Sequence, residues 1–298
     1  MKDKVYIILL NYNGANDTIA CINSIKENET KANYNIIVVD NLSTDNSIDR
    51  LKSIENIILL QSNENGGFAK GNNIGIKYAM NNNADYVLLL NTDTEIEKDA
   101  ISILVKKAKS DSDVGIVGSR IMYYDNRNLI NYYGGKFDWI KGIVIHEDYK
   151  KKYKAEEKLE KYTDFITGCC MLIKRKVIEE VGMLPEEYFM YYEDADYCVK
   201  VKEQGYKLAI CSNSVIYHKV SSSSGGENSP FCIQWGNRNR LIFMKKYKKY
   251  TKGILSKIIY YITRYILYMK YLIKKDKARA KAIKKGMLEG RKYIKENC

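Results

Sequence analysis

The chain has 298 residues, of which 45% are hydrophobic and 29% are charged, and its formal net charge is +13. This length and composition suit one large α/β domain or two small ones and argue against a disordered or fibrous protein. Residues 245–298 hold 18 Lys and Arg against 3 Asp and Glu, leaving 31 against 33 for residues 1–244, so the excess charge belongs to a C-terminal tail.

Short apolar runs alternate with helical patterns over the first hundred residues. The runs predict strands at Val5–Leu10, Ile36–Asp40, Ile57–Leu60 and Tyr86–Leu90, and helices near 16–28, 45–54 and 69–81. Strands that are nearly all apolar and separated by single helices indicate βαβ units and a buried parallel sheet. Ligands bind beyond the carboxyl ends of such strands, and patches rich in Asn, Asp and Gly follow each of them.

The second half is less regular. From about residue 122 to 162 the sequence has no clear period and is rich in Tyr, Gly and Lys, which predicts an irregular excursion over the site. Regular structure is expected to return at Phe165–Lys174, followed by a helix at 175–181, a helix starting near Glu193 and a strand at 207–211.

Two patches have the chemistry of a nucleotide site. Asp40 ends a predicted strand, where a carboxylate can accept hydrogen bonds from a ribose or a base; capping of the next helix is the alternative, more so for Asp45. Residues 63–75 open the third helix, but Phe68 breaks the GxGxxG pattern and excludes the dinucleotide fingerprint. Their glycines allow close backbone approach and their asparagines suit a base or a sugar, although the segment could be a simple turn.

Two further residues are candidate metal ligands. Asp93 lies just past the strand at Tyr86–Leu90, where a hard oxygen ligand can bind a divalent ion that bridges two phosphates. Helix capping is the alternative for Asp93, and Glu97 serves it better. His218 ends the apolar run that starts at Val215, and from the residues alone it is as much a structural histidine as a ligand.

Three carboxylates follow an aromatic cluster at Phe189–Asp196. Glu193, Asp194 and Asp196 lie within four residues, so they raise one another's pKa unless a cation or substrate uses them. A carboxylate held against apolar walls is suited to act as a general base. The alternative is that a helix N-terminus simply favours the acids.

Together these motifs resemble family 2 glycosyltransferases with the GT-A fold, in the branch of rhamnosyl- and galactofuranosyltransferases of cell-surface polysaccharides. The matching segments lie in the family's order over about residues 4–245: Ile7–Gly14, Val38–Asp45, Asn65–Gly75, Leu89–Asp93, Gly168–Val181, Phe189–Asp196 and Tyr217–His218. The expected fold is α/β, with a mostly parallel central sheet flanked by helices and a C-terminal helical extension. The expected domains are a GT-A glycosyltransferase domain at 1–245 and a basic amphipathic helical tail at 246–298.

The resemblance also implies a nucleotide site and a metal site. Asp40, with Asn65 and Asn72, is expected to bind the nucleotide of a dTDP- or UDP-linked sugar. Asp93 and His218 are expected to bind Mg²⁺ or Mn²⁺. The first acid of the family's DxD motif is Asn91 here, which leaves the metal with fewer charged ligands.

The reaction implied by the resemblance is an inverting single displacement. Asp194 is the expected general base, taking a proton from a hydroxyl of a cell-surface glycan or a lipid-linked acceptor; rhamnose is one candidate for the transferred sugar. Glu193 and Asp196 are expected to orient acceptor hydroxyls. Arg238, within Gly236–Arg240, is a candidate for a phosphate or acceptor contact, with a surface salt bridge as the alternative.

The basic tail carries an amphipathic pattern. On a helical wheel one arc of roughly 100° collects Leu255, Ile258, Ile259, Ile262, Ile266, Met269 and Ile273. Lys257, Arg264 and Lys275 lie opposite. A basic amphipathic helix with flanking tyrosines predicts attachment to an anionic membrane surface. The alternative packs the stripe on the catalytic domain or on a second copy in a homo-oligomer.

The expected location is the cytoplasm, peripheral on the inner face of the cell membrane. Seven scattered cysteines without a CxxC pair fit reduced thiols. The apolar run at Val5–Leu10 is too short for a signal peptide, and no run of about 18 uncharged apolar residues predicts a spanning helix.

Three other functions fit the residues less well. A nucleotidyltransferase would need a cationic Gly-rich loop after the first strand, and Asn11–Gly14 holds no Lys or Arg. A nucleic-acid-binding protein could use the basic tail, but no reading motif accompanies it, so we expect no nucleic-acid partner. A non-catalytic homologue that only binds sugar nucleotides is disfavoured by the presence of Asp93, Asp194 and His218.

Overall fold

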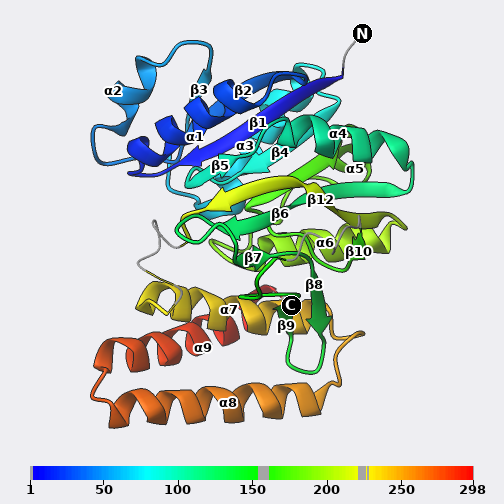
Figure 1. Ribbon diagram of the computed structural model, residues 1–298. Coiled ribbons are helices and arrows are strands. Elements are labelled where there is room, and N and C mark those ends of the chain that lie inside the picture. Colours follow the sequence, from blue (N-terminus) through cyan, green and yellow to red (C-terminus); the bar gives the residue numbers. More distant parts are fainter. Residues whose placement is uncertain (1–2, 154–160, 221–225, 227, 298) are drawn as a thin grey trace. The chain divides into compact units, whose positions relative to one another are not determined.

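The computed structural model describes residues 3–153, 161–220, 226 and 228–297 (Figure 1). The chain forms two compact units. The first unit comprises Met1–Lys136, His146–Phe189 and Glu193–Val220, and the second comprises Phe137–Ile145, Met190–Tyr192 and Ser221–Cys298. None of the helices in the described ranges is both long and apolar enough to cross a membrane.

A ten-stranded sheet organises the first unit. Its strands are β1 (Lys4–Asn11), β2 (Asn33–Asp40), β3 (Ile58–Gln61), β4 (Tyr86–Leu90), β5 (Thr94–Ile96), β6 (Val114–Tyr123), β7 (Ile130–Tyr132), β10 (Lys161–Thr163), β11 (Cys170–Lys174) and β12 (Lys207–His218). The order is β10-β12-β6-β11-β4-β1-β2-β3, with β5 paired to β12 and β7 to β6.

The half of this sheet formed by β4, β1, β2 and β3 is parallel, as predicted. β1 pairs in parallel with β2 and β4, β2 with β3, and β6 with β12, whereas β11 runs antiparallel between β4 and β6. The register aligns Asn11 with Asp40 and Asp40 with Gln61, so the carboxyl ends of β1, β2 and β3 meet at one edge. The predicted α/β class with a mostly parallel sheet is confirmed.

Six described helices belong to the first unit: α1 (Ala15–Asn28), α2 (Ser47–Lys52), α3 (Gly67–Asn81), α4 (Ala100–Ser110), α5 (Arg175–Val181) and α6 (Glu193–Glu203). Two glycines bring α3 unusually close to β1. A Cβ at Gly71 would lie 2.4 Å from a methyl of Leu10, and one at Gly75 would lie 2.7 Å from a methyl of Ile8. These glycines therefore set the distance between the helix and the sheet.

The segment at 122–162 contains more regular structure than predicted. β6 reaches Tyr123, β7 pairs with β6, and β10 pairs with β12. β8 (Gly135–Asp138) and β9 (Ile143–His146) form a separate two-stranded sheet. The periodicity of such short strands is weak, and β10 has its partner far away in the sequence. Residues 154–160 of this segment lie outside the described part.

Three long helices form most of the second unit: α7 (Pro230–Lys246), α8 (Ile254–Ile273) and α9 (Lys277–Asn297) (Figure 1). Ser229 caps α7 by accepting a hydrogen bond from the backbone N of Cys232 at 3.2 Å, and Pro230 occupies the first turn. α9 packs closely on α7 because Gly286 and Gly290 carry no side chain; a Cβ at Gly286 would lie 2.2 Å from the carbonyl oxygen of Gln234.

The division of the chain differs from the expected one. The boundary expected at residue 245 falls at the end of α7, whereas the second unit includes all of α7. Contacts between aromatic rings explain why two short segments also belong to this unit. The rings of Trp139 and Phe243 lie 5.7 Å apart at an interplanar angle of 6°, and those of Tyr192 and Phe243 lie 5.3 Å apart.

The predicted tail helix is present as α8, and its two faces differ sharply. One face packs within the unit: Tyr260 is fully buried and its hydroxyl donates to the carbonyl oxygen of Asn237 at 2.9 Å. The apolar stripe is exposed, with exposed fractions of 49% for Ile258, 54% for Ile262 and 61% for Ile266.

Candidate active site

Asp93 and His218 lie side by side because β5 pairs with β12, which sets His218 opposite Thr94. The His218 Nε2 atom is 3.1 Å from the Asp93 Oδ1 atom, and both side chains are largely buried. This spacing is that of a hydrogen bond, and it also allows a divalent ion, because two ligand atoms about 2.1 Å from one cation at a right angle would be about 3 Å apart.

The protein supplies only part of a coordination shell here. The described residues contain no cluster of three or more His, Cys, Asp and Glu side chains that could hold a metal. Mg²⁺ is commonly held by one or two protein ligands together with substrate phosphates. Burial favours a lower pKa for His218, but Cys169 and Asp93 outweigh it and hold that pKa well above its ordinary value.

Asp40 is fully buried at the end of β2 and already accepts three hydrogen bonds. Its Oδ1 atom accepts from Asn11 Nδ2 at 2.8 Å and from Ser43 Oγ at 2.6 Å, and its Oδ2 atom accepts from the backbone N of Ser43 at 2.9 Å. In this arrangement Asp40 shapes the loop that follows β2. Its direct contact with a nucleotide stays a prediction.

The two asparagines of the expected nucleotide site are placed differently. Asn65 meets the loop after β2, since its Oδ1 atom accepts from Asn41 Nδ2 at 2.9 Å and from the backbone N of Gly67 at 3.2 Å. Asn72 is buried in α3, where its Nδ2 atom donates to the carbonyl oxygen of Phe68 at 2.9 Å. The structure therefore joins Asn65, but not Asn72, to the Asp40 loop.

The start of α3 contacts the segment that precedes the acidic cluster. Gly67 has φ +79°, and a Cβ there would lie 1.9 Å from the carbonyl oxygen of Phe189. The backbone N of Phe68 donates to the same oxygen at 2.8 Å. The Gly-rich loop and the Phe189 segment, more than a hundred residues apart in sequence, are thus locked together.

Asp194 lies in the first turn of α6 and is held by two backbone donors. Its Oδ2 atom accepts from the backbone N of Gly168 at 3.0 Å, and its Oδ1 atom accepts from the backbone N of Ala195 at 2.8 Å. Burial raises the pKa of Asp194, while these hydrogen bonds oppose the rise. Gly168 has no room for a side chain, because a Cβ there would lie 2.9 Å from the ring of Phe68.

Glu193 is buried beside Asp194 and differs in its bonding. Its Oε2 atom has no hydrogen-bond partner among the described residues. Burial and the charge of Asp194 raise the pKa of Glu193 well above its usual range. Backbone donors favour the ionised form of Asp194, whereas the Oε2 atom of Glu193 has no such donor among the described residues, so Glu193 is the member of the pair whose neutral form is favoured.

Asp196 and Arg238 are directed elsewhere. Asp196 is fully buried, and its Oδ2 atom accepts from the hydroxyl of Tyr188 at 2.9 Å, so it presents no surface to an acceptor. Arg238 belongs to the second unit, where its guanidinium lies over the rings of Trp235 and Tyr293 at 5.3 and 5.0 Å. Both residues are explained here by packing, and their acceptor roles stay predictions.

Asn239, a residue that the sequence did not single out, holds the backbone of the segment before Glu193 by hydrogen bonds. Tyr191 and Tyr192 have φ angles of +70° and +76°, a costly conformation for bulky residues. Asn239, fully buried on α7, donates from Nδ2 to the carbonyl oxygens of Met190 at 2.8 Å and Tyr191 at 2.9 Å. The sequence signal was the Asn-rich run at 236–240, but the strained backbone cannot be read from it.

The profile of glycosyl transferase family 2 matches residues 6–182, which is more than half of the chain. The chain belongs to this family. It is therefore a glycosyltransferase, as predicted. The low-salt glycan biosynthesis hexosyltransferase Agl10 of Haloferax volcanii is 27% identical over 258 residues, covering 81% of this chain and 76% of that protein. The N-acetylglucosaminyl-diphospho-decaprenol L-rhamnosyltransferase of Mycobacterium tuberculosis is 25% identical over 213 residues, covering 65% and 69%.

Solved structures confirm the fold of this family 2 member. A mannosyltransferase from Pyrobaculum calidifontis, in complex with GDP-Man and Mn²⁺, superposes with a TM-score of 0.60 at 16% identity and covers 99% of this chain and 75% of that chain. The predicted GT-A fold is thus confirmed, and the low identity limits this likeness to the fold.

Proposed function

We propose that this family 2 glycosyltransferase is an inverting, metal-dependent enzyme. It moves a sugar, with rhamnose as the first candidate, from a dTDP- or UDP-linked donor to a hydroxyl of a cell-surface glycan or lipid-linked acceptor. The observation that carries the proposal is the partly buried Asp194 carboxylate, held by two backbone donors beside the buried Glu193, whose pKa is raised well above its usual range. The Mycobacterium tuberculosis relative, a rhamnosyltransferase by name, supports this choice of sugar and acceptor.

Asp194 performs the proton transfer in this proposal. It takes the proton of the acceptor hydroxyl while that oxygen bonds to the anomeric carbon and the bond from this carbon to the phosphate oxygen breaks. The nucleoside diphosphate leaves, and one displacement inverts the configuration. Burial raises the pKa of Asp194, which brings it closer to that of an effective base near neutral pH.

Asp93 and His218 would hold Mg²⁺ or Mn²⁺ in this proposal. Their 3.1 Å separation supports it, as does the Mn²⁺ bound by the Pyrobaculum calidifontis enzyme. A divalent ion neutralises negative charge that develops on a leaving diphosphate. Since Asn91 supplies no charge, phosphate oxygens and water would complete the shell. Asp93→Asn should therefore raise the metal concentration needed for nucleotide release.

The remaining roles follow from the placement of each residue. The loop shaped by Asp40 and Asn65 is proposed to contact the nucleotide. Glu193, whose Oε2 atom is unpaired among the described residues, is proposed to bond an acceptor hydroxyl. In its neutral form this carboxyl can both donate and accept.

The deciding experiment combines a donor panel with one substitution. Nucleotide sugars are first scored for metal-dependent nucleotide release and for sugar transfer to glycan acceptors. Asp194→Asn should then lower transfer by about 10²- to 10⁴-fold, as expected for loss of a general base, with nucleotide affinity within twofold of the parent. Asp49→Asn, at a largely exposed carboxylate, is the matched control. Transfer by Asp194→Asn at the parental rate would place the base elsewhere.

We further propose peripheral attachment of the enzyme to the inner face of the cell membrane through α8. Its apolar stripe is exposed, and residues 245–298 hold 18 Lys and Arg against 3 Asp and Glu. Burial of such a stripe in the interface, with attraction of the cations to anionic lipid, stabilises attachment. A second copy of the chain on the same stripe is the competing outcome of the test given below.

A further inference from the structure

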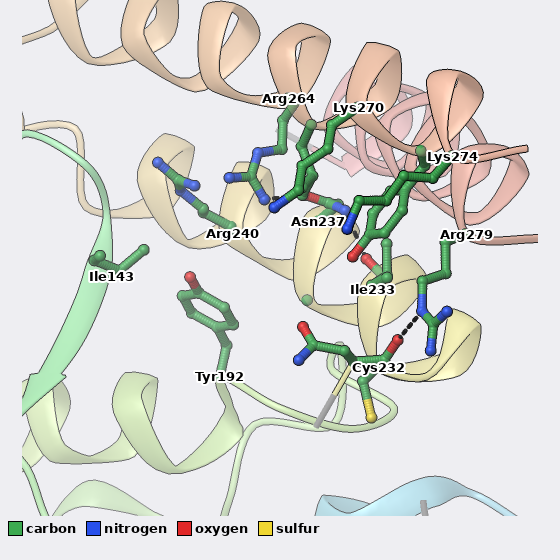
Figure 2. Close-up of a pocket in the computed structure, with 14 residues that line it drawn as sticks. Ile143, Tyr192, Cys232, Ile233, Asn237, Arg240, Arg264, Lys270, Lys274 and Arg279 are labelled. Atoms are coloured by element: carbon green, nitrogen blue, oxygen red, sulfur yellow. Dashed lines mark hydrogen bonds between the residues drawn. The ribbon is translucent and has the colours of Figure 1, made fainter. Parts of the chain in front are cut away.

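The second unit contains a cavity of about 530 Å³, here called the basic pocket. Five cationic side chains line it: Arg240, Arg264, Lys270, Lys274 and Arg279. Figure 2 shows that they come from all three long helices of the unit. No Asp or Glu is among the described residues of its lining. Such a concentration of like charge is costly unless an anion offsets it.

Arg264 shows this cost most clearly. Its Nη1 atom donates to Asn237 Oδ1 at 3.0 Å, but its buried Nε has no hydrogen-bond partner in the described part of the chain. Burial and the neighbouring Arg240 lower the pKa of Arg264. A buried guanidinium donor that lacks an acceptor indicates a site prepared for an anionic ligand.

The other cations differ in how firmly they are held. Arg240 is fixed, since its Nε atom donates to the carbonyl oxygen of Lys141 at 2.7 Å. Arg279 is partly neutralised by Asp276 at 2.5 Å. Lys270 and Lys274, one helical turn apart, form no ion pair with any described carboxylate. The pocket thus combines fixed guanidinium donors with two adaptable ammonium groups.

An apolar groove adjoins the basic pocket on α8. This groove has a volume of about 420 Å³ and is lined by Tyr265, Ile266, Met269 and Ile273 together with Lys270 and Lys274. The two lysines therefore belong to both linings. A ligand that follows this surface would meet cations at one end and hydrocarbon at the other.

We propose that the basic pocket binds the diphosphate group of a lipid-linked acceptor, whose hydrocarbon chain lies in the adjoining groove of α8. The inference rests on the proposed transferase function, because it assigns the ligand the role of acceptor. A diphosphate offers several anionic oxygens to the guanidinium and ammonium donors. The pocket volume lies within the range of about 300–1,000 Å³ typical of small-molecule sites.

The lining of the basic pocket also continues directly into the proposed catalytic segment. Tyr192 lines the pocket and immediately precedes Glu193 in the chain. The backbone at Tyr192 is held by contacts within the second unit, including the donation of its hydroxyl to the carbonyl oxygen of Gly142 at 2.9 Å. The chain itself therefore joins the pocket lining to the residue proposed to bond the acceptor hydroxyl.

The test measures binding to the full chain by calorimetry, with farnesyl diphosphate, inorganic pyrophosphate and farnesol as probes. The variant is Lys270→Gln with Lys274→Gln, and the matched control is Lys257→Gln with Lys275→Gln. All four lysines are exposed, and each double variant removes two charges from α8 or its C-terminal turn. Farnesyl diphosphate should bind at least tenfold more tightly than pyrophosphate and farnesol. The pocket variant should lose at least tenfold affinity for both diphosphates, and the control less than twofold.

Four results would overturn the inference. Equal losses in the two double variants would indicate nonspecific attraction to the basic surface. Equal affinity for pyrophosphate and farnesyl diphosphate would exclude the hydrocarbon groove. Binding to phosphatidylglycerol vesicles without binding of farnesyl diphosphate would assign the cations to the lipid surface. Competition of UDP or dTDP with farnesyl diphosphate would assign the pocket to the donor.

These outcomes are separable from failure of the proposed function. Binding is measured without catalysis, so a chain that binds farnesyl diphosphate as expected but transfers no sugar would refute the transferase proposal and retain the site. Conversely, sugar transfer to a lipid-free glycan with no diphosphate binding would refute only this inference.

Discussion

Gly67→Ala should damage both the stability and the activity of this enzyme. Gly67 has φ +79°, a region that side chains strongly disfavour. The added Cβ would lie 1.9 Å from the carbonyl oxygen and 2.7 Å from the carbonyl carbon of Phe189. These are backbone atoms and cannot rotate away, so either the start of α3 or the Phe189 segment must move.

The expected cost can be assembled from three parts. The left-handed conformation costs about 1–2 kcal/mol for a residue with a Cβ. Displacement of packed backbone costs about 1–3 kcal/mol by analogy with overpacked cores. Loss of the hydrogen bond from Phe68 N to Phe189 O adds about 1 kcal/mol. A total of about 3–6 kcal/mol is a large share of a typical stability of about 5–15 kcal/mol, and corresponds to a fall in Tm of about 6–24 °C.

Thermal unfolding followed by circular dichroism, together with steady-state transfer rates, tests this prediction. The control is Gly14→Ala, because Gly14 has φ −139° and its added Cβ would approach no atom closer than 3.6 Å. The control should change Tm by less than 1 °C, whereas Gly67→Ala should also lower kcat because the segment leading to Asp194 moves. A Gly67→Ala protein with parental Tm and kcat would refute the packing argument.

Three further predictions concern Asn239, the pair of Glu193 and Asp194, and the exposed stripe of α8. Asn239→Leu removes both hydrogen bonds from Asn239 Nδ2 to segment 190–192, so we expect Tm to fall and kcat to drop more than the affinity for nucleotide. An unchanged kcat would show that these hydrogen bonds are purely structural. Glu193 has a raised pKa in the folded protein, so its stabilising contribution is present at low pH and is lost as pH rises above its ordinary 4.5. As pH rises from 4.5 to 8, the Tm of the parent protein should therefore fall relative to the Tm of the Glu193→Gln variant. Parallel plots of Tm against pH for the two proteins would contradict this. Replacement of three exposed residues of α8 by Ser should weaken co-sedimentation with phosphatidylglycerol vesicles at least tenfold; these are Ile258, Ile262 and Ile266. A change from dimer to monomer in this variant without loss of co-sedimentation would instead indicate a subunit interface.

The parallel half of the sheet was predictable because its signals are local. The runs at Val5–Leu10 and Tyr86–Leu90 are apolar on both faces, as strands covered on both sides must be. Their ends carry the polar residues of the candidate site. α5 was also predicted with its correct bounds, 175–181. Strands such as β7 and β10 are only three residues long and are specified by their pairing partners, so the local hydrophobic pattern could not predict them.

The candidate site was only partly predictable, because neighbouring residues in a sequence need not share surroundings. Arg238 was chosen within Gly236–Arg240, yet it is Arg240 that lines the basic pocket, while Arg238 lies over aromatic rings. Two positions apart on a helix place side chains about 200° apart, so a motif identifies the helix but not the face. Asp194 and Asp196 are likewise two positions apart on α6. Asp194 accepts hydrogen bonds from the backbone N atoms of Gly168 and Ala195, whereas Asp196 is fully buried and accepts from the hydroxyl of Tyr188.

The sequence by itself determined the family, the order of the strands along the chain and the types of residue at their ends, because apolar periodicity and short motifs are local properties. The tertiary structure decided which of those residues meet. Only the pairing of β5 with β12 brings His218 to Asp93, and only burial beside Asp194 raises the pKa of Glu193 well above its usual range. The excess charge of the tail was evident from counting, but helix packing decided that four of its cations converge with Arg240 on one cavity. Convergence depends on distances between helices, which no stretch of sequence encodes alone.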